Sequence, residues 1–401
     1  MLKWINEAAL KDYPAITEAE AREALSLCIS GVLHYAEDFA DRFPYACSKN
    51  GFYEPVPNRG WTTGFYTGQI WLAYENADTE EDREKLLQYG RRQVESFDER
   101  IRKKIDVDHH DMGFLYTPSC VAAYKLTGSE KAKKAAILAA DQLVSRFQPV
   151  GEFLQAWGEM GAKDNYRFII DCLLNLPLLY WADTETHSSD HHYRETAEKH
   201  IHTAMRYVIR EDDSTWHTIF MDPVTGKFDH GATCQGYQDG SAWARGQAWG
   251  IYGTAMAYRY TGRDDYIGYF KRVTAYFLNH LPKDLCPCWD LTFGDGDGES
   301  RDSSSAVIAA CGMLEMSRFL PETESLTYTG IAKKLLKAMA DHYSVRDIGK
   351  AGGRLLHGTY SKKSPYNTCT PEGVDECVLW GDYYYMEGLN RVLHPSWNVY
   401  W

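Results

Sequence analysis

The stretch AMAYRYTGRDDY, at residues 255–266, decides how the chain is organised. It reads as the end of one helix, a glycine turn and the start of the next helix, because Gly is favoured just past a helix C-terminus and Asp near a helix start. Two similar strings close other apolar segments, LAYENADTEED at 72–82 and AAYKLTGSEKA at 122–132. Such a repeat is typical of folds that stack pairs of helices, so the sequence predicts an all-α protein.

The chain alternates between two kinds of predicted helix. Aromatic-rich helices that are apolar on all sides are expected at 61–76, 111–126, 167–182, 245–260, 302–319 and 380–393. Helices with one apolar stripe and charged residues elsewhere are expected at 18–42, 80–99, 129–147, 190–210, 263–280 and 325–344. The first kind is typical of buried helices and the second of peripheral ones. We therefore expect an (α/α)6 toroid, an inner ring of six helices within an outer ring of six.

The rest of the chain indicates little else in the way of structure. No Pro- or Ser-rich linker divides it, so we expect residues 1–401 to form one domain. No segment alternates between apolar and polar residues for long, and only 214–238 and 284–294 are candidates for short strands. No sequence feature indicates an oligomeric state.

The charge balance limits the partners that the protein can take. Lys and Arg number 43 against 56 Asp and Glu, which gives a net charge of −13. A protein without a basic field cannot hold a nucleic acid by long-range attraction, so no nucleic-acid partner is expected. The 12 Trp, 28 Tyr and 15 Phe suit a carbohydrate cleft, because aromatic rings stack on the faces of sugars.

The N-terminal stretch and the cysteines bear on where the protein works. The stretch has no charged region followed by an apolar one, and no apolar run approaches the ~20 residues that cross a bilayer. The ten cysteines are scattered without a CxxC pair, and several lie in apolar helical runs, as reduced buried thiols do. We expect a cytoplasmic protein that has no membrane partner.

The string RFIIDCLLNLPLLYW, at 167–181, contains the first candidate for catalysis. In a helix, Arg167, Asp171 and Asn175 would share one face because they are four residues apart. Apolar surroundings remove water from a carboxylate and raise its pKa, so Asp171 is a candidate general acid. The alternative is a structural pair of Asp171 with an arginine.

A second candidate lies in DVDHHDMGFLY, at 106–116. The dense His and Asp cluster suggests a metal site, but adjacent residues point in different directions and no HExxH or spaced His pair is present. We therefore expect no metal and no other cofactor. Asp111 is predicted instead to be the carboxylate partner of Asp171, because glycoside hydrolysis commonly uses two carboxylates.

The string CQGYQDGSAWARGQAWGIYG, at 234–253, contains a candidate sugar receptor. Arg245, Trp249 and Tyr252 would lie on one face of a helix. Arg offers a fork of N–H donors to a carboxylate, and the aromatic rings can stack on sugar. The alternative is an Arg–Trp contact in the protein core.

Three motifs in order, HHDMGF, IIDCLLNLPLL and RGQAWGIYG, together resemble the unsaturated glucuronyl hydrolases of glycoside hydrolase family 88. The resemblance runs from about Trp61 to WGDYYYMEGL at 380–389 and is consistent with the toroid. It implies that the chain removes 4,5-unsaturated glucuronic acid from lyase-generated chondroitin and hyaluronan disaccharides. Asp171 matches the principal acid/base and Asp111 the second essential aspartate. The resemblance also implies a set of substrate-binding residues: Trp61, His110, Trp157, His217, Gln235, Arg245 and Trp249.

The resemblance implies that water is added across the C4=C5 double bond, with Asp171 as acid and then base and Asp111 stabilising positive charge. No metal or nucleotide is needed for this reaction. One alternative is an unsaturated rhamnogalacturonyl hydrolase, which acts on pectin fragments. Another is a sugar-binding toroid without catalysis, in which Asp171 would be structural.

The string GTYSKKSPY, at 358–366, resembles the sulfate-contacting Ser-x-x-Ser-x-Lys string of some family members. Ser361 and Ser364 match its serines, while Tyr366 replaces its Lys. Lys362 or Lys363 is a candidate for the missing charge. The alternative is an ordinary polar surface loop. The resemblance predicts that chondroitin and hyaluronan disaccharides are both substrates and that sulfate is tolerated.

Overall fold

The computed structural model describes residues 7–187 and 189–401. The prediction that the N-terminal stretch is not a leader begins with residues 1–6. These six residues lie outside the described residues. Within the described part of the chain, no helix is both long and apolar enough to cross a membrane.

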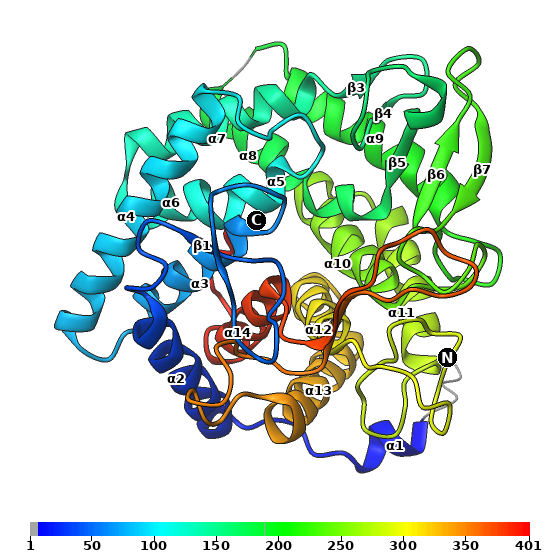
Figure 1. The fold of residues 1–401 in the computed structure, drawn as a ribbon. Helices are drawn as coiled ribbons and strands as arrows, with labels where there is room; N and C mark the ends of the chain where they lie inside the picture. The colour runs from blue at the N-terminus through cyan, green and yellow to red at the C-terminus, as the bar shows by residue number, and fades with distance from the viewer. Residues whose placement is uncertain (1–6, 188) are drawn as a thin grey trace.

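The apolar helices pack against one another in the middle of the molecule (Figure 1). They are α3 (Thr63–Glu75), α5 (Met112–Tyr116) with its continuation, α8 (Pro177–Thr186), α10 (Ala244–Thr261), α12 (Ser303–Ser317) and α14 (Leu379–Leu393). Each contacts the next in the order α3, α14, α12, α10, α8 and α5, and α5 contacts α3 again. α5 continues through the π-helical turn Thr117–Val121 into α6 (Ala122–Thr127). The prediction that the fold belongs to the all-α class is confirmed.

The charged helices cover this group from outside. They are α2 (Glu18–Tyr35), α4 (Glu80–Arg102), α7 (Glu130–Val144), α9 (His192–Val208), α11 (Asp265–Asn279) and α13 (Glu322–Ala338). α2 and α4 lie at the left margin of Figure 1 and contact α3. Three of these helices begin at a side-chain cap, since Thr17, Thr79 and Ser129 accept hydrogen bonds from the backbone three residues on. Shorter pieces are α1 (Glu7–Asp12), the 3-10 turn Lys163–Asn165 and the π-helical turn Met339–Tyr343.

The repeated strings form turns as predicted. Gly128 and Gly262 end α6 and α10 in the left-handed conformation, with φ of 69° and 65°. A side chain with a Cβ adopts this conformation at a cost, whereas Gly does not. The string at 72–82 uses Asn76 to end α3 and Thr79 to cap α4 instead.

The predicted helix at 167–182 is wrong in its first half. The chain forms the strand β5 (Arg167–Ile169) and the 3-10 turn Ile170–Leu174 before α8 begins at Pro177. Pairing of β5 with β6 (Thr218–Met221) outweighs the apolar pattern, and Pro177 suits the first turn of a helix. Arg167, Asp171 and Asn175 therefore share no helical face.

Short antiparallel sheets fill the loops. β6 pairs with β5 and with β7 (Phe228–Ala232), which confirms strands within 214–238. Segment 284–294 forms isolated bridges rather than a strand, with Asp290 opposite Trp243 and Cys288 opposite Arg301. The remaining pairs are β1 (Phe43–Pro44) with β2 (Pro55–Val56), β3 (Phe147–Gln148) with β4 (Phe153–Leu154), and β8 (Gly358–Ser361) with β9 (Glu372–Glu376).

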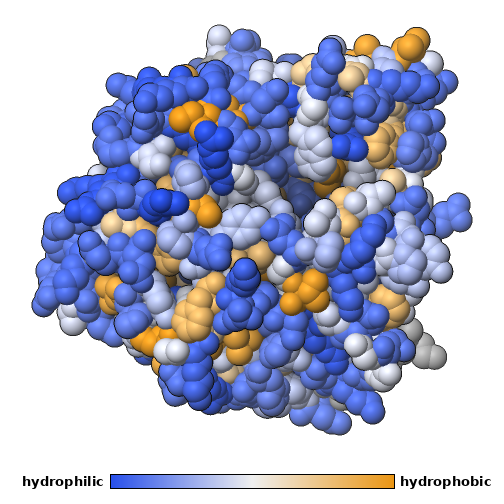
Figure 2. Space-filling view, in the orientation of Figure 1, coloured by the Kyte–Doolittle hydropathy of each residue, from blue (hydrophilic) through white to orange (hydrophobic). Residues whose placement is uncertain are grey.

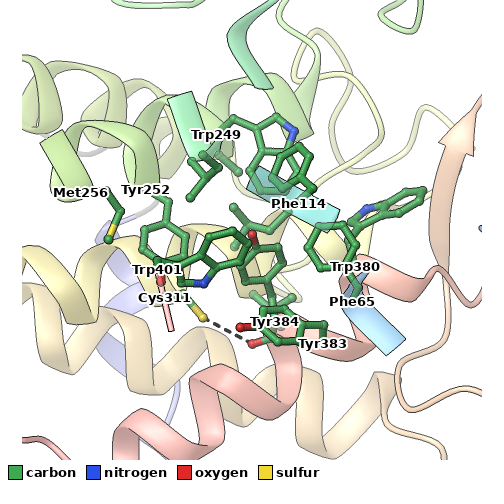
Figure 3. Close-up of a cluster of buried hydrophobic side chains, with 14 of the residues drawn as sticks. Phe65, Phe114, Trp249, Tyr252, Met256, Cys311, Trp380, Tyr383, Tyr384 and Trp401 are labelled. Atoms are coloured by element: carbon green, nitrogen blue, oxygen red, sulfur yellow. Dashed lines mark hydrogen bonds between the residues drawn. The ribbon is translucent and has the colours of Figure 1, made fainter. Parts of the chain in front are cut away.

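Aromatic side chains fill the centre between the inner helices (Figure 3). The C-terminal Trp401 is fully buried and stacks on Tyr384, with ring centroids 5.8 Å apart. Its indole Nε1–H donates to Glu387 Oε2 at 2.7 Å. Burial of such large rings stabilises the core, and the hydrogen bond satisfies the polar end of the indole.

Candidate active site

A cavity of about 550 Å³ opens at the N-terminal ends of α3 and α5. Figure 2 shows a hollow near the centre of this face. The cavity is lined by seven of the residues predicted from the sequence, namely Trp61, His110, Asp111, Trp157, Asp171, His217 and Gln235.

Asp171 lies in the 3-10 turn between β5 and α8 and reaches the cavity. The pKa of its carboxyl is raised to about 7, because burial and the charge of Asp111 raise it more than the charge of Arg245 lowers it. Its Oδ1 is buried and accepts no hydrogen bond from the described residues. A carboxyl in this state keeps a proton near neutral pH, as a general acid requires.

Asp111 is the N-cap residue of α5, and its pKa is shifted in the opposite direction from that of Asp171. His109 Nδ1 lies 3.0 Å from its Oδ2, and His110 Nε2 lies 3.3 Å from its Oδ1. Burial alone raises the pKa of Asp111, but His110, the hydrogen bond from His109 and the charge of Arg100 outweigh burial and lower it. The cavity thus holds one carboxyl that retains a proton and one that is ionised.

His110 and His217 are neutral walls of the cavity. Burial lowers the pKa of both rings, in His217 to about 3. His217 Nδ1 lies 3.1 Å from the backbone N–H of Cys234, which donates to it, so Nε2 carries the hydrogen. Gln235, next to Cys234, donates from Nε2 to the carbonyl of Tyr360 at 3.1 Å.

Two tryptophans stand on the cavity wall. Trp61 stacks on Trp380 at 4.9 Å, and its Nε1–H donates to the Tyr360 hydroxyl at 3.0 Å. Trp157 is 40% exposed and meets the His110 ring edge-on at 6.0 Å. Exposed indole faces beside a polar cavity are suited to sugar rings.

Arg245 lies outside the residues that line the cavity, and its role as a carboxylate receptor stays a prediction. The side chain is fully buried, and Nη1 donates to Asp302 Oδ2 at 3.0 Å and to the carbonyl of Thr359 at 2.7 Å. Nη2 donates to the carbonyl of Tyr360 at 2.8 Å. These bonds use Nη1 and one N–H of Nη2, while the buried Nε has no partner among the described residues. The charge of Arg245 also reaches the cavity, where it lowers the pKa of Asp171.

Trp249 also lies outside the residues that line the cavity, and its contact with sugar stays a prediction. Its side chain is fully buried and packs against Phe114 at 5.1 Å and Tyr384 at 5.6 Å, as Figure 3 shows. The α10 face that carries Trp249 points into the aromatic core. Tyr252, three residues on, is likewise buried there.

In the predicted sulfate loop both serines have hydrogen-bond partners within the protein, and their contact with sulfate stays a prediction. Ser361 Oγ donates to the carbonyl of Thr370 at 2.6 Å, and Ser364 Oγ accepts the backbone N–H of Tyr366 and Asn367, both at 3.0 Å. Both serines are buried. Their hydroxyls hold the loop in shape, and neither residue lines the cavity. The nearby lysines are also occupied, since Lys362 pairs with Glu299 and Lys363 bonds the Asn367 carbonyl.

Several lining residues were missed by the sequence analysis. The largest group comes from the β8–β9 hairpin and comprises Tyr360, Thr368, Cys369, Thr370 and Glu372. Tyr360 lies in the string at 358–366 but was not itself a candidate, and nothing in the local sequence distinguishes the other four from an ordinary loop. The hydrogen bond of Asn367 Nδ2 to the carbonyl of Gly236, at 2.9 Å, brings the hairpin beside the segment that carries Gln235.

No cluster of three or more His, Cys, Asp or Glu residues that could hold a metal ion occurs in the described residues. His109 and His110 instead pair with Asp111, as described above.

Known proteins resemble the chain over almost its whole length. Residues 35–392 match the family described as Glycosyl Hydrolase Family 88. The chain is 43% identical over 392 residues to an unsaturated chondroitin disaccharide hydrolase of Streptococcus pneumoniae, which covers 97% of this chain and 96% of the relative.

Solved structures agree with this match. The crystal structure of the unsaturated glucuronyl hydrolase of Streptococcus agalactiae has a TM-score of 0.93 and 42% identity, covering 100% of this chain and 98% of that one. A mutant of that enzyme, complexed with dGlcA-GalNAc6S, has a TM-score of 0.85 and 38% identity over the same shares. The chain therefore belongs to glycoside hydrolase family 88.

Proposed function

We propose that the protein is an unsaturated glucuronyl hydrolase that removes 4,5-unsaturated glucuronic acid from chondroitin and hyaluronan disaccharides made by polysaccharide lyases. The observation that carries the proposal is the pair of cavity carboxyls in opposite states. The pKa of Asp171 is raised to about 7, whereas that of Asp111 is lowered. Paired carboxyls with separated pKa values divide the roles of acid and charge stabiliser.

The reaction begins at the double bond of the unsaturated uronate. The protonated Asp171 gives its proton to C4, and positive charge develops at C5 beside the ring oxygen. The ionised Asp111 stabilises this charge. Asp171, now ionised, takes a proton from the water that attacks C5. The resulting hemiketal opens, and the second sugar leaves.

The remaining lining residues hold the substrate. The hydrogen on Nε2 of His217 and the Gln235 side chain are polar contacts for the uronate, and Trp61 and Trp157 offer ring faces to the sugars. The neutral state of both histidines keeps them from competing with Asp171 for protons near neutral pH.

The relatives support this substrate class over pectin fragments. Those reported above are named for unsaturated chondroitin disaccharides or unsaturated glucuronyl groups, and one mutant was solved with dGlcA-GalNAc6S. The separated pKa values of Asp171 and Asp111 argue against a binding toroid without catalysis, which would have no need of them.

We further propose that the inner and outer helices form an (α/α)6 toroid as one domain over residues 1–401. The closed series of inner-helix contacts supports this. A cytoplasmic location is supported by the cysteines, which are all unpaired, with nine of the ten buried.

A panel of lyase-derived disaccharides tests the proposed function. Each would be incubated with the protein while the ultraviolet absorbance of the enoate is followed. Loss of absorbance with unsaturated chondroitin and hyaluronan disaccharides is expected. Activity confined to unsaturated rhamnogalacturonan disaccharides would contradict the proposal.

A further inference from the structure

Arg167 has no role in the mechanism above, yet its side chain is fixed beside the cavity. Its guanidinium carbon lies over two rings, 4.9 Å from the centre of Trp157 and 5.2 Å from the centre of Phe220. These cation–π contacts hold the guanidinium, with its fork of N–H donors, in place.

The donors of this fork are almost unused by the protein. Among the described residues, Arg167 has one long side-chain hydrogen bond, from Nη2 to Asn165 Oδ1 at 3.4 Å, and its buried Nε has no partner. Other arginines of the same region form salt bridges. Arg146 Nη1 lies 2.7 Å from Asp108, and Arg245 Nη1 lies 3.0 Å from Asp302, although the Nε of Arg245 also has no partner among the described residues. Arg167 is half-buried, and within the described part of the chain it has no salt bridge, so an anionic ligand would supply the missing counter-charge.

The side chain of Arg167 points to the cavity side of its strand. Alternate residues of a strand share a face, so Arg167 lies on the same face of β5 as Ile169, which lines the cavity. Trp157, against which the guanidinium packs, also lines the cavity. The charge of Arg167 lowers the pKa of His110 and His217 on the cavity wall, which agrees with this position.

We propose that Arg167 is a substrate-binding residue that receives an oxyanion of the disaccharide at the cavity rim. The proposal rests on the proposed function. The oxyanion is either the carboxylate of the unsaturated uronate or a sulfate ester on the neighbouring sugar, since both present two oxygens to a guanidinium fork. Among the described residues, no Lys or Arg lines the cavity itself, so Arg167 at the rim is a cationic side chain from which an anionic substrate could accept hydrogen bonds.

Binding to an inactive enzyme separates this role from catalysis. Calorimetry would measure the Kd of unsaturated chondroitin disaccharide for Asp171→Asn alone and for Asp171→Asn combined with Arg167→Gln or Arg167→Lys. We expect the Kd to rise by about ten- to a hundredfold with Gln, since charge-assisted hydrogen bonds are lost. Lys keeps the charge but loses the fork, so it should recover part of the affinity.

Lys163→Gln is the matched control. It removes the same charge from an exposed residue four positions before Arg167 and should leave the Kd unchanged. Circular dichroism would check that each variant is folded, and Arg167→Lys keeps the test open if Arg167→Gln does not fold.

The choice of disaccharide distinguishes the two oxyanions. An equal rise of Kd with unsulfated and 6-sulfated chondroitin disaccharides identifies the uronate carboxylate, and a rise with the sulfated one alone identifies the sulfate. An unchanged Kd for both disaccharides in folded Arg167→Gln and Arg167→Lys would overturn the inference, even though the wild type turns over its substrates. A wild type that is inert on every unsaturated disaccharide would instead refute the proposed function, and this inference with it.

Discussion

Raising the pH from 5 to 9 should switch the enzyme off by ionising Asp171. Burial raises the pKa of this carboxyl to about 7, and only the protonated form can protonate C4. The protonated fraction is about one half at pH 7, about one tenth at pH 8 and about one hundredth at pH 9. Because kcat/KM reports the free enzyme, it should fall about fivefold from pH 7 to 8 and about tenfold from pH 8 to 9.

The acid side of the profile depends on Asp111, which must be ionised. Its pKa is lowered from the ordinary value of 3.8, so activity should persist from neutral pH down to about 4. The profile is therefore expected to have a broad plateau that ends at an alkaline limb near pH 7. Initial rates of enoate absorbance loss, at substrate concentrations well below KM, would measure it.

Two variants check the assignment of the limb to Asp171. Arg245→Lys keeps the charge that opposes the raised pKa of Asp171, so the limb should stay where it is. Asp111→Asn removes a charge that raises this pKa, so the limb of its residual activity should move to lower pH. A wild-type kcat/KM that rises from pH 5 to 8, or stays flat to pH 9, would refute Asp171 as the initial acid.

Three further predictions concern single sites. Asp111→Asn should lower kcat by about 10² or more, because the charge at C5 loses its stabiliser; single-turnover rates near wild type would reduce Asp111 to a structural residue. Asp171→Asn should be more stable than wild type at pH 8 but not at pH 4. The folded-state pKa of Asp171 exceeds the unfolded one, so the destabilisation that Asn removes grows from pH 4 to about 7 and then stays constant. The full pKa shift corresponds to about 4 kcal/mol in the free energy of unfolding, and solvent in the cavity reduces the expected gain to about 1–2 kcal/mol. Urea unfolding would measure this gain, and an equal difference between variant and wild type at pH 4 and pH 8 would contradict the prediction. The double variant Ser361→Ala, Ser364→Ala should lower stability and affect sulfated and unsulfated chondroitin disaccharides equally, since both hydroxyls bond the loop; a loss confined to the sulfated substrate would restore the sulfate-contact hypothesis.

Local patterns in the sequence were sufficient to predict the helices and part of the site. Helical periodicity and the Gly turns at 128 and 262 depend on neighbours in the chain, so they could be read directly. The apolar setting of Asp171 also correctly indicated a raised pKa. The strand β5 could not be predicted, because its partner β6 lies about fifty residues away and outweighs the local pattern.

The same limit applies to the surroundings of the candidate site residues. The pairing of Arg245 with Asp302 could not be predicted, because the two residues lie far apart along the chain and only the fold brings them together. Trp249 shares the apolar helix with Arg245, and spacing alone cannot tell whether its ring faces the cavity or the core. Tyr360 lies in the string at 358–366 without being one of its matching residues, and Glu372 belongs to no motif, so their place on the cavity wall emerges only in three dimensions.

The most direct test compares wild type and Asp171→Asn on unsaturated chondroitin disaccharide. The enoate absorbance and the release of the amino sugar would be followed together, with calorimetry to confirm that the variant still binds. The account predicts that wild type consumes the double bond in step with release, while the folded variant is slower by about 10²–10⁴ because its amide cannot donate the proton to C4. A folded, substrate-binding Asp171→Asn that turns over at close to the wild-type rate would contradict it.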